Sequence, residues 1–543
     1  MRNALGQREE ALRAAERAVA YCREMVAAQP DSCRPDLASS LDNLALRRGA
    51  LGLREQALKA AEEAAAIYRE LAAERADDFQ PHLARSLNNL ATLLSSLGRR
   101  EDALRELREA VGLYRELAAV RPDAFRPYLA KSLNHLASAL GALGRSIDAL
   151  SAAEEVVGFY RELALTRPES FQHDLAASIG NLANGLSAVG RDEDALRAAE
   201  EAVGLYRELA LARSDVRPDL AASLNNLGNR LSAMGRREEA LRATEEAVEL
   251  RRELATIRPD AFRPYLAKSL NNLADRLADL GRREDALRAL EEAIGLGRGI
   301  VASREAFRPE LAQSLNNQAI ILSDLSGPEI ALRPGEEAVG LYRALAATQP
   351  DEFLPALAAS LNNLSNWMSD LGRHEDALRA TEEAIQLRRE LAAVRRHAFQ
   401  PYLAKSLNTL VNRLTDLGRR GDALRAAEET VGVYRELAVA RPDDFRPDLA
   451  MSLSVLADCL ETNGRISDAV KFDQESIVTL APALASHAAL ARTMLDCLKD
   501  YLRRAKAAGA EPDYESVVPI VEHLQALIES QKQTQASSSH TSL

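Results

Sequence analysis

Aromatic residues are scarce in this chain, which has a single tryptophan among 543 residues and only 4 % Phe, Trp and Tyr together. Residues that favour β-strands are sparse outside helical patterns, whereas Leu, Ala, Glu and Arg dominate, and such a composition favours helices. The chain is also too long for one compact hydrophobic core. The sequence therefore predicts a helical architecture that grows by repetition.

Long apolar segments are absent as well. The sequence has no stretch of about 18 apolar residues, the length that a membrane-spanning helix needs, and its N-terminus has no apolar signal core. Four cysteines, Cys22, Cys33, Cys459 and Cys497, lie far apart without a CxxC pair, which indicates a reducing compartment. We therefore expect a cytoplasmic protein with no membrane contact.

Signatures of chemistry are missing too. The sequence contains no GxxxxGK[ST], HExxH, paired CxxC or GxSxG segment, and its eight histidines form no ligand pair at helical spacing. Acidic residues outnumber basic ones, 81 to 69, and the two signs are interspersed, whereas a nucleic-acid-binding protein concentrates positive charge. We therefore expect no catalytic residue, no cofactor, no metal and no nucleic-acid partner. An active site within residues 482–530 is the weakest alternative, since no polar cluster stands there.

What the sequence does contain is a repeat. The segment Leu-Gly-Arg-x-x-Asp/Glu-Ala-Leu recurs with a spacing of 46 residues, with one gap of 45 and one gap of 91 in which Ser326 takes the place of the glycine. Its glycines are Gly6, Gly52, Gly98, Gly144, Gly190, Gly235, Gly281, Gly372, Gly418 and Gly464.

Each repeat predicts two helices. In one copy, leucines at i, i+3 and i+4 spacing predict a first helix from Pro264 to Leu280, which Gly281 ends because glycine adopts the left-handed conformation of a helix terminus. A second apolar stripe predicts a second helix of about 20 residues. A link such as Arg121 to Pro127 would start the next repeat, and the phenylalanine of each link would fill the joint between repeats. These phenylalanines are Phe79, Phe125, Phe171, Phe262, Phe307, Phe353, Phe399 and Phe445.

The pattern Leu270-x-x-Leu273-Ala274, Gly281, Ala286, Leu290, Ala293 resembles the tetratricopeptide repeat. The period exceeds the about 34 residues usual in that family and is similar to extended repeats of kinesin light chains and of fungal and bacterial signalling arrays. The resemblance covers roughly residues 5–480 and implies an all-α fold, a right-handed α-solenoid of helix-turn-helix repeats. It also implies a protein-binding function without catalysis.

The repeats divide the chain into expected parts. Residues 1–34 hold an orphan second helix, whose apolar side (Leu12, Ala15, Val19) would be exposed and could support self-association or mark an N-terminal truncation. Ten repeats follow over residues 35–481. Pro334, inside a second helix, predicts a hinge at 295–336. Residues 482–530 predict a helical cap built from helices at 482–508 and 513–530, and residues 531–543 a disordered tail.

The resemblance also implies where partners bind, because first helices line the concave surface in that family. Asparagines recur at the fifth and sixth places of these helices, and amides can hydrogen-bond the backbone of an extended peptide, or else bond the neighbouring helix. Charges at the second and thirteenth places would make the N-terminal part of the groove more cationic and the C-terminal part more anionic, unless they are ordinary exposed charges. The candidate groove residues are Asn89, Lys131, Asn181, Asn226, Lys268, Asn272, Asn317, Asn363, Lys405, Asp279, Asp324, Asp370 and Asp416.

The sequence therefore predicts a scaffold or adaptor that binds peptide segments of partner proteins. The alternative is the sensor portion of a larger signalling protein linked to an NTPase or a CHAT domain. The repeated Glu-Glu pairs of the second helices, such as Glu154-Glu155, stand beside arginines and predict a salt-bridged outer face.

Overall fold

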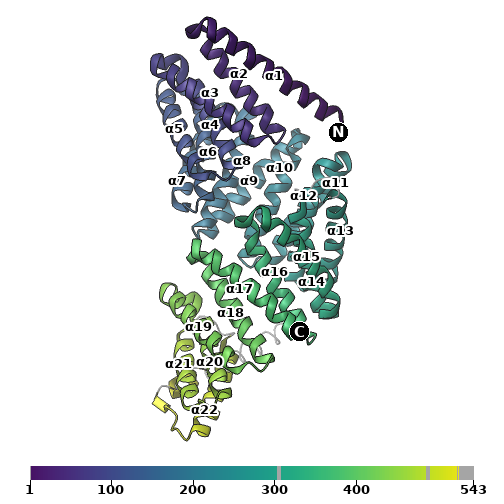
Figure 1. Cartoon of the computed structure of the whole chain (residues 1–543), viewed down its shortest axis with the longest axis vertical. Helices are drawn as coiled ribbons and strands as arrows, with labels where there is room; N and C mark the ends of the chain where they lie inside the picture. Colours follow the sequence, from purple (N-terminus) through teal and green to yellow (C-terminus); the bar gives the residue numbers. More distant parts are fainter. Residues whose placement is uncertain (1, 302–306, 485–489, 516, 523, 525–543) are drawn as a thin grey trace, which may run out of the picture. The chain divides into compact units, whose positions relative to one another are not determined.

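The computed structural model describes residues 2–301, 307–484, 490–515, 517–522 and 524. Helices make up 92 % of the described residues, which contain no strand (Figure 1). The helices follow one another in tandem pairs, so the predicted all-α solenoid of helix-turn-helix repeats is confirmed. The contacts within the chain divide it into two compact units, Met1–Pro259 and Asp260–Leu543.

The first unit contains eleven α-helices and one short 3-10 helix among its described residues. They are α1 (Arg2–Ala28), α2 (Pro30–Ala50), α3 (Arg54–Glu74), α4 (Ala76–Ser96), α5 (Arg100–Val120), α6 (Pro122–Ala142), α7 (Ser146–Thr166), α8 (Pro168–Ala188), α9 (Asp192–Ala212), η1 (Ser214–Val216), α10 (Arg217–Ala233) and α11 (Arg237–Ile257). Each helix packs on the next along the chain. Even-numbered helices are first helices of repeats and odd-numbered ones are second helices.

The second unit continues the pattern. Its helices are α12 (Pro259–Asp279), α13 (Arg283–Val301), α14 (Arg308–Ser326), α15 (Pro328–Thr348), α16 (Pro350–Asp370), α17 (His374–Val394), α18 (Arg396–Asp416), α19 (Arg420–Ala440), α20 (Pro442–Thr462), α21 (Ile466–Leu484) and α22 (Ala491–Ala508). In both units successive first helices also contact each other, as α4 does with α6 and α14 with α16.

Two helices of 21 residues, one linking residue and a three-residue turn account for the 46-residue period. The turn between α4 and α5 is Leu97-Gly98-Arg99, and Gly98 has φ of 77°, the left-handed conformation for which the sequence predicted glycine. The other connection is Arg121 alone, extended at φ −132° and ψ 74°, between α5 and α6. Short connections of this kind hold neighbouring helices antiparallel.

The predicted link from Arg121 to Pro127 is therefore wrong, because all but its first residue belong to α6. Likewise the helix expected to start at Pro264 starts at Pro259. Pro122 occupies the first helical position, where no intrahelical donor is needed. Pro127 follows so closely that the one carbonyl it leaves without a donor belongs to exposed Asp123, where water can reach it.

The phenylalanines of the former links sit at the start of the first helices. Phe79, Phe353 and Phe445 are each 8 % exposed and belong to the hydrophobic clusters of their units. In several repeats the linking residue is an arginine that lies over the ring, for example Arg75 at 4.8 Å from the Phe79 centroid. This contact fixes the single linking residue.

The opening helix differs from the prediction. Val19 is 4 % exposed and Leu12 and Ala15 are half-buried, because all three join the hydrophobic cluster that α1 forms with α2. The expectation that this apolar side is exposed is wrong, since a second helix presents its main stripe to the following first helix. The exposed side of α1 carries Ala18 and Tyr21 instead. Self-association through α1 stays a prediction.

The region predicted as a hinge contains an uninterrupted helix, α15, that passes through Pro334. Gly335 lies against the indole of Trp367 on α16, so closely that a Cβ atom at this position would stand 2.5 Å from Cζ3. The glycine is thus explained by packing. Residues 302–306 lie outside the described residues, and the hinge at 295–336 stays a prediction.

The C-terminal helices differ in their bounds from the prediction of one helix over 482–508. Helix α21 extends to Leu484 with Pro482 inside it, and α22 starts at Ala491. Met494, Cys497 and Leu498 of α22 pack with Ile477 and Leu480 of α21 in a hydrophobic cluster that also includes Val517 and Leu524. These residues pack against the last repeat, in the region for which the sequence predicts a helical cap. The tail at 531–543 lies outside the described residues.

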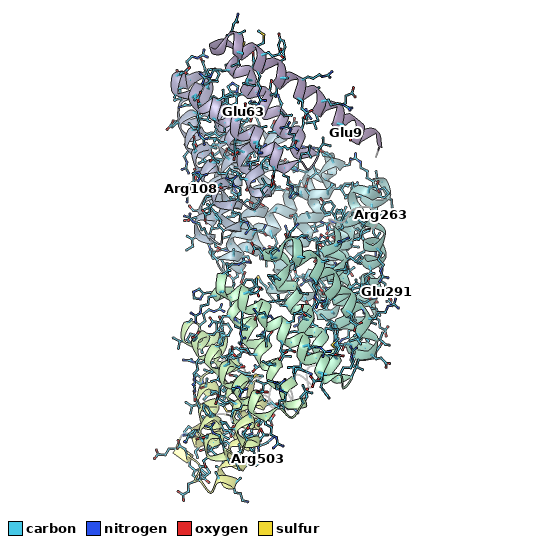
Figure 2. The ribbon with its side chains drawn as sticks, in the orientation of Figure 1. Glu9, Glu63, Arg108, Arg263, Glu291 and Arg503 are labelled. Carbon is cyan, nitrogen blue, oxygen red and sulfur yellow. The ribbon has the colours of Figure 1, made fainter. Side chains whose placement is uncertain are left out.

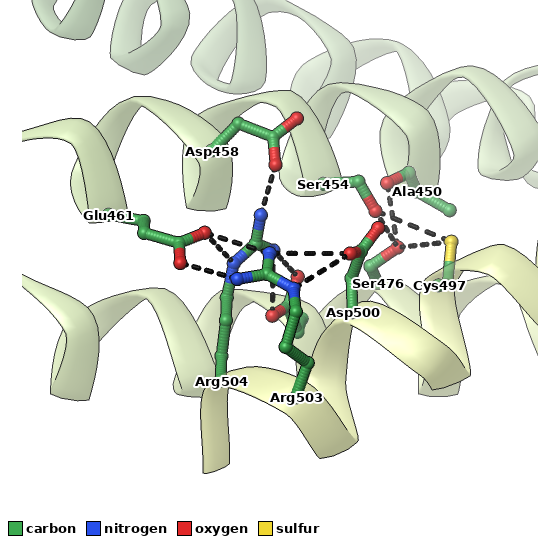
Figure 3. A network of polar contacts seen from close by, with 10 residues as sticks. Ala450, Ser454, Asp458, Glu461, Ser476, Cys497, Asp500, Arg503 and Arg504 are labelled. Carbon is green, nitrogen blue, oxygen red and sulfur yellow. Dashed lines mark hydrogen bonds and ion pairs between the residues drawn. The ribbon is translucent and has the colours of Figure 1, made fainter. Parts of the chain in front are cut away.

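Arg504 anchors this cap. Its side chain is 1 % exposed and bonds both carboxylate oxygens of Asp473, at 2.7 and 2.9 Å, Glu461 at 2.7 Å and Asp458 (Figure 3). Neighbouring Arg503 pairs with Glu461 from the exposed side. The network ties α22 to α20 and α21, so removing Arg504 would leave the buried carboxylate of Asp473 without its counter-charge.

Candidate binding surface on the first helices

The candidate groove residues all lie on first helices of the repeats. The second-place cations Arg85, Lys131, Lys268 and Lys405 are exposed, as are Asp279, Asp324 and Asp370 at the thirteenth place, whereas the asparagines at the fifth and sixth places are mostly half-buried. Since the same places recur on every first helix, the structure sets these side chains in rows along each unit.

Asparagines of the fifth place form hydrogen bonds with the serine at the third place of the next first helix. Asn88 Nδ2 donates to Ser132 Oγ at 2.6 Å, and Asn362 Nδ2 donates to Ser406 Oγ at 2.9 Å. Ser314 Oγ donates to Asn271 Oδ1 at 2.7 Å in the reverse direction. These bonds hold successive first helices in register, so the fifth place serves the fold.

The sixth place is mixed. Asn181 donates to Asn134 at 2.9 Å, Asn363 to Asn316 at 3.5 Å and Asn317 to Asp275 at 3.0 Å, so these three amides bridge neighbouring first helices. Asn89 and Asn226 have no side-chain hydrogen bond to any residue that the structure describes. Asn272 is half-buried. Some amides of the sixth place thus bond a neighbouring first helix, whereas others, among them Asn89 and Asn226, stay open.

The aspartates of the thirteenth place are partly neutralised. Asp324 accepts from Arg283 at 3.3 Å, Asp416 accepts from Ser369 at 2.8 Å and lies 3.4 Å from Arg413, and Asp279 lies 3.6 Å from Arg276. In the second unit this row is therefore less anionic than the sequence suggests, whereas Arg85 and Lys131 of the first unit form no ion pair with a described residue.

A cavity of about 370 Å³ opens between α2, α4 and α6, and Tyr114 of α5 contributes to its wall. Sequence reasoning found Asn89 and Lys131 but missed other members of this site. Asp42 stands where most repeats have the fifth-place asparagine, and His135 replaces the sixth-place asparagine. Both are departures from the repeat at a groove position, a signal that was available in the sequence. The lining residues are Ser39, Asp42, Asn43, Leu46, Arg85, Asn88, Asn89, Tyr114, Tyr128, Lys131 and His135.

The second helices present a different surface. On most second helices an arginine near the C-terminal end reaches a glutamate about 40 residues later on the next second helix, as Arg23 does to Glu63, a residue marked in Figure 2. Other examples are Arg69–Glu109, Arg115–Glu155, Arg161–Glu201, Arg343–Glu383, Arg389–Glu429 and Arg435–Glu475. The acidic pairs therefore form salt bridges, as the sequence predicted, and their charges are mostly satisfied within the chain.

Two aspartates of the first helices, buried Asp42 and half-buried Asp275, have a raised pKa. Desolvation by burial raises the pKa of Asp42 to about 6, although a hydrogen bond from Ser86 and the charge of Arg85 oppose the change. Desolvation likewise raises the pKa of Asp275 to about 6. Burial, with a smaller effect of Lys131, lowers the pKa of His135, so its imidazole is neutral at pH 7.

Lowering the pH from 7 to about 5 is expected to stabilise the chain through Asp42 and Asp275, each by on the order of 1–2 kcal/mol. Their folded-state pKa lies above the unfolded one, so the folded chain binds more protons and stability falls as the pH rises through about 6. Urea unfolding at both pH values checks this in the wild type and in an Asp42→Asn, Asp275→Asn variant. The variant should gain less stability than the wild type when the pH is lowered; an unchanged pH effect would contradict the assignment.

Among the described residues no group of three or more His, Cys, Asp or Glu side chains could hold a metal ion. None of the described helices combines the length and the apolar character that crossing a membrane requires.

Comparison with known proteins identifies the family of the repeats. A family model described as tetratricopeptide repeat matches residues 83–119, 129–164, 175–210, 220–255, 266–298, 357–397 and 403–444. A second model, anaphase-promoting complex subunit 5, matches residues 31–77. The family scan identified no catalytic family, and a search of curated proteins found no match.

Solved structures with similar folds are distant in sequence. BtubC (BKLC) from P. vanneervenii is 20 % identical over 45 % of this chain and 90 % of its own, with a TM-score of 0.38. A putative kinesin light chain repeat protein of Podosopora anserina is 18 % identical over 41 % and 98 %, with a TM-score of 0.34. A signal transduction ATPase with a tetratricopeptide repeat sensor from Pyrococcus horikoshii is 13 % identical over 71 % and 54 %, with a TM-score of 0.44.

Proposed function

Because this chain is built from tetratricopeptide repeats, which generally mediate protein–protein interactions, we propose that it is a cytoplasmic scaffold that binds peptide segments of partner proteins along its first helices. The repeat fold suggests an interaction scaffold as a class.

The contrast between the two helix layers carries this proposal. Charges on the second helices pair with each other from repeat to repeat, as Arg161 does with Glu201. The first helices instead present amides and a cation without a hydrogen bond or ion pair to the described residues, namely Asn89, Asn226 and Lys131. Polar groups that the fold leaves open can bond a ligand without breaking an internal bond. The first-helix surface is therefore the better candidate for binding.

Replacing Asn89 and Asn226 with alanine is expected to weaken the capture of partner proteins by about tenfold or more, because each amide would lose a hydrogen bond to the partner. Affinity capture from a lysate, quantified against the wild-type chain, measures this. A matched control replaces exposed Arg108, Glu116 and Glu208 of the second helices with alanine and should keep the partners.

Helical circular dichroism and thermal melting establish that both variants remain folded. If the asparagine variant keeps all partners while the second-helix variant loses them, the binding surface lies on the opposite layer and the proposal is wrong. The alternative, a sensor array of a larger NTPase- or CHAT-linked signalling protein, needs the same surface. A partner captured by the first helices would be its input signal.

A further inference from the structure

The cavity between α2, α4 and α6 has an acceptor-rich floor. Asp42 is 4 % exposed, and its Oδ1 accepts from Ser86 at 2.8 Å, whereas Oδ2 has no hydrogen-bond partner in the described part of the chain. Asn88 donates to Ser132, and its Oδ1 likewise lacks a partner. Nδ1 of His135 is the third buried atom without one. Three buried polar atoms of residues that line one cavity are thus left unsatisfied.

Departures from the repeat produce this arrangement. Elsewhere a sixth-place asparagine donates to the fifth-place residue of the preceding first helix, as Asn181 does to Asn134 and Asn363 to Asn316. His135 stands at the sixth place opposite Asn88, and that bond is missing, so the amide oxygen and the imidazole both stay open. At pH values above its pKa of about 6, the carboxylate of Asp42 is ionised, so it accepts hydrogen bonds and cannot donate one. The row of amides is therefore open at α2, α4 and α6.

The open atoms define the chemistry of a ligand. A carboxylate oxygen and an amide oxygen require N–H or O–H donors, and a neutral imidazole nitrogen accepts in one tautomer. The wall adds two aromatic rings, Tyr114 at 3 % exposure and Tyr128 at 53 %, which stack with centroids 5.9 Å apart. A planar guanidinium offers five N–H donors and packs on aromatic faces, so it suits such a cavity better than an ammonium does.

The remaining charges of the cavity restrict the ligand further. Arg85 and Lys131 line it, are exposed and form no ion pair with a described residue. They would repel an isolated cation, whereas an acidic group beside the guanidinium would pair with them. Mixed charge in the ligand matches mixed charge in the cavity.

We propose that this cavity binds an arginine side chain of a partner segment, with an acidic residue next to that arginine paired to Arg85 and Lys131. The guanidinium donates to Asp42 Oδ2 and Asn88 Oδ1, and the Tyr128 ring flanks it. This inference rests on the proposed peptide-binding function and names its ligand: a peptide segment in which arginine and an acidic residue are adjacent.

The probe is the blocked peptide acetyl-Gly-Arg-Asp-Gly-amide, titrated at millimolar concentration against the full chain and followed by saturation-transfer NMR. Exchanging its arginine for citrulline, which keeps the shape and removes the charge, is expected to weaken binding at least about tenfold, since charge-assisted hydrogen bonds are lost. The Asp42→Asn variant should bind the arginine peptide about tenfold more weakly for the same reason. Lys131→Ala should abolish the preference for Asp over Asn in the peptide but keep the preference for arginine over citrulline.

Asp275→Asn is the matched control, because Asp275 is also a first-helix aspartate with a raised pKa but lies outside this cavity and accepts from Asn317, and this variant should bind like the wild type. Undetectable binding, equal binding of the citrulline peptide, or an Asp42→Asn variant with wild-type affinity would each overturn the arginine site. Partner capture distinguishes the proposed binding surface from the proposed arginine site. If the Asn89, Asn226 variant loses its partners and the Asp42→Asn variant keeps them, the binding surface stands and only the arginine site is wrong.

Discussion

Replacing Arg504 with alanine is expected to destabilise the C-terminal cap by about 3–5 kcal/mol, the largest effect predicted for a single substitution in this protein. Arg504 and Asp473 are both 1 % exposed, and the guanidinium also satisfies Glu461 and Asp458. Without it, Asp473 would be a buried carboxylate with no counter-charge. Hydrogen exchange of α22 and urea unfolding followed by circular dichroism measure the loss.

Two variants test the cause. Arg503→Ala removes an arginine that is 52 % exposed and pairs with Glu461, and it should cost less than about 1 kcal/mol. The double variant Arg504→Leu, Asp473→Leu removes both buried charges and should recover most of the stability. If Arg504→Ala exchanges at α22 like the wild type, the network does not hold the cap.

The stability that Arg504→Ala removes should also become smaller as the pH falls from 7 to 5. Burial raises the pKa of Asp473 to about 6 even beside Arg504, and losing the arginine would raise it further. The folded-state pKa then lies above the unfolded one, so protonating the carboxyl stabilises the folded variant and this stability is lost again as the pH rises. A deficit that is the same at both pH values would contradict this account.

Alanine at Gly335 is expected to destabilise α15 and its packing on α16 by about 1–3 kcal/mol. A glycine inside a helix normally gains stability on replacement with alanine, but here the new methyl group would stand 2.5 Å from the ring of Trp367, which is 6 % exposed and cannot move aside freely. The clash therefore outweighs the gain in helix propensity. Thermal and urea unfolding of the full chain measure it.

Gly340 of the same helix provides the control, because a Cβ atom there would have no neighbour within 4 Å. Gly340→Ala should stabilise the chain by about 1 kcal/mol, so the two glycine variants are expected to differ in sign and by about 2–4 kcal/mol. Trp367→Leu should rescue Gly335→Ala by making room. Two glycine variants of equal stability would show that Trp367 does not dictate the glycine.

Much of the fold was readable because its causes are local. Gly98 and its equivalents marked the turns, since only glycine takes φ near 77° without strain, and the spacing of leucines gave the apolar stripe of each helix. The predicted starts of the first helices lie too far along the sequence: Pro264 was predicted to begin the helix, whereas α12 starts at Pro259. A proline near a helix start is compatible with both interpretations.

The sequence predicted the candidate site only as a set of positions that recur in every first helix. The sequence located the fifth and sixth places of each first helix, but it could not distinguish Asn181, which donates to Asn134, from Asn89, which remains open. That difference depends on the side chain that stands opposite on the next helix. Asp42 and His135 were visible as departures from the repeat, and their meeting in one cavity was not.

The sequence by itself thus determined the architecture of this protein: the helical repeat, its 46-residue period, its turns and the salt-bridged second helices, all set by propensity and by contacts that recur in every repeat. Only the tertiary structure decided what is unique to one place, namely which amides stay open, how Trp367 requires Gly335, and how Arg504 meets Asp473 from 31 residues away. The physical reason is that repeated contacts leave a period in the sequence, whereas a single contact between distant residues leaves none.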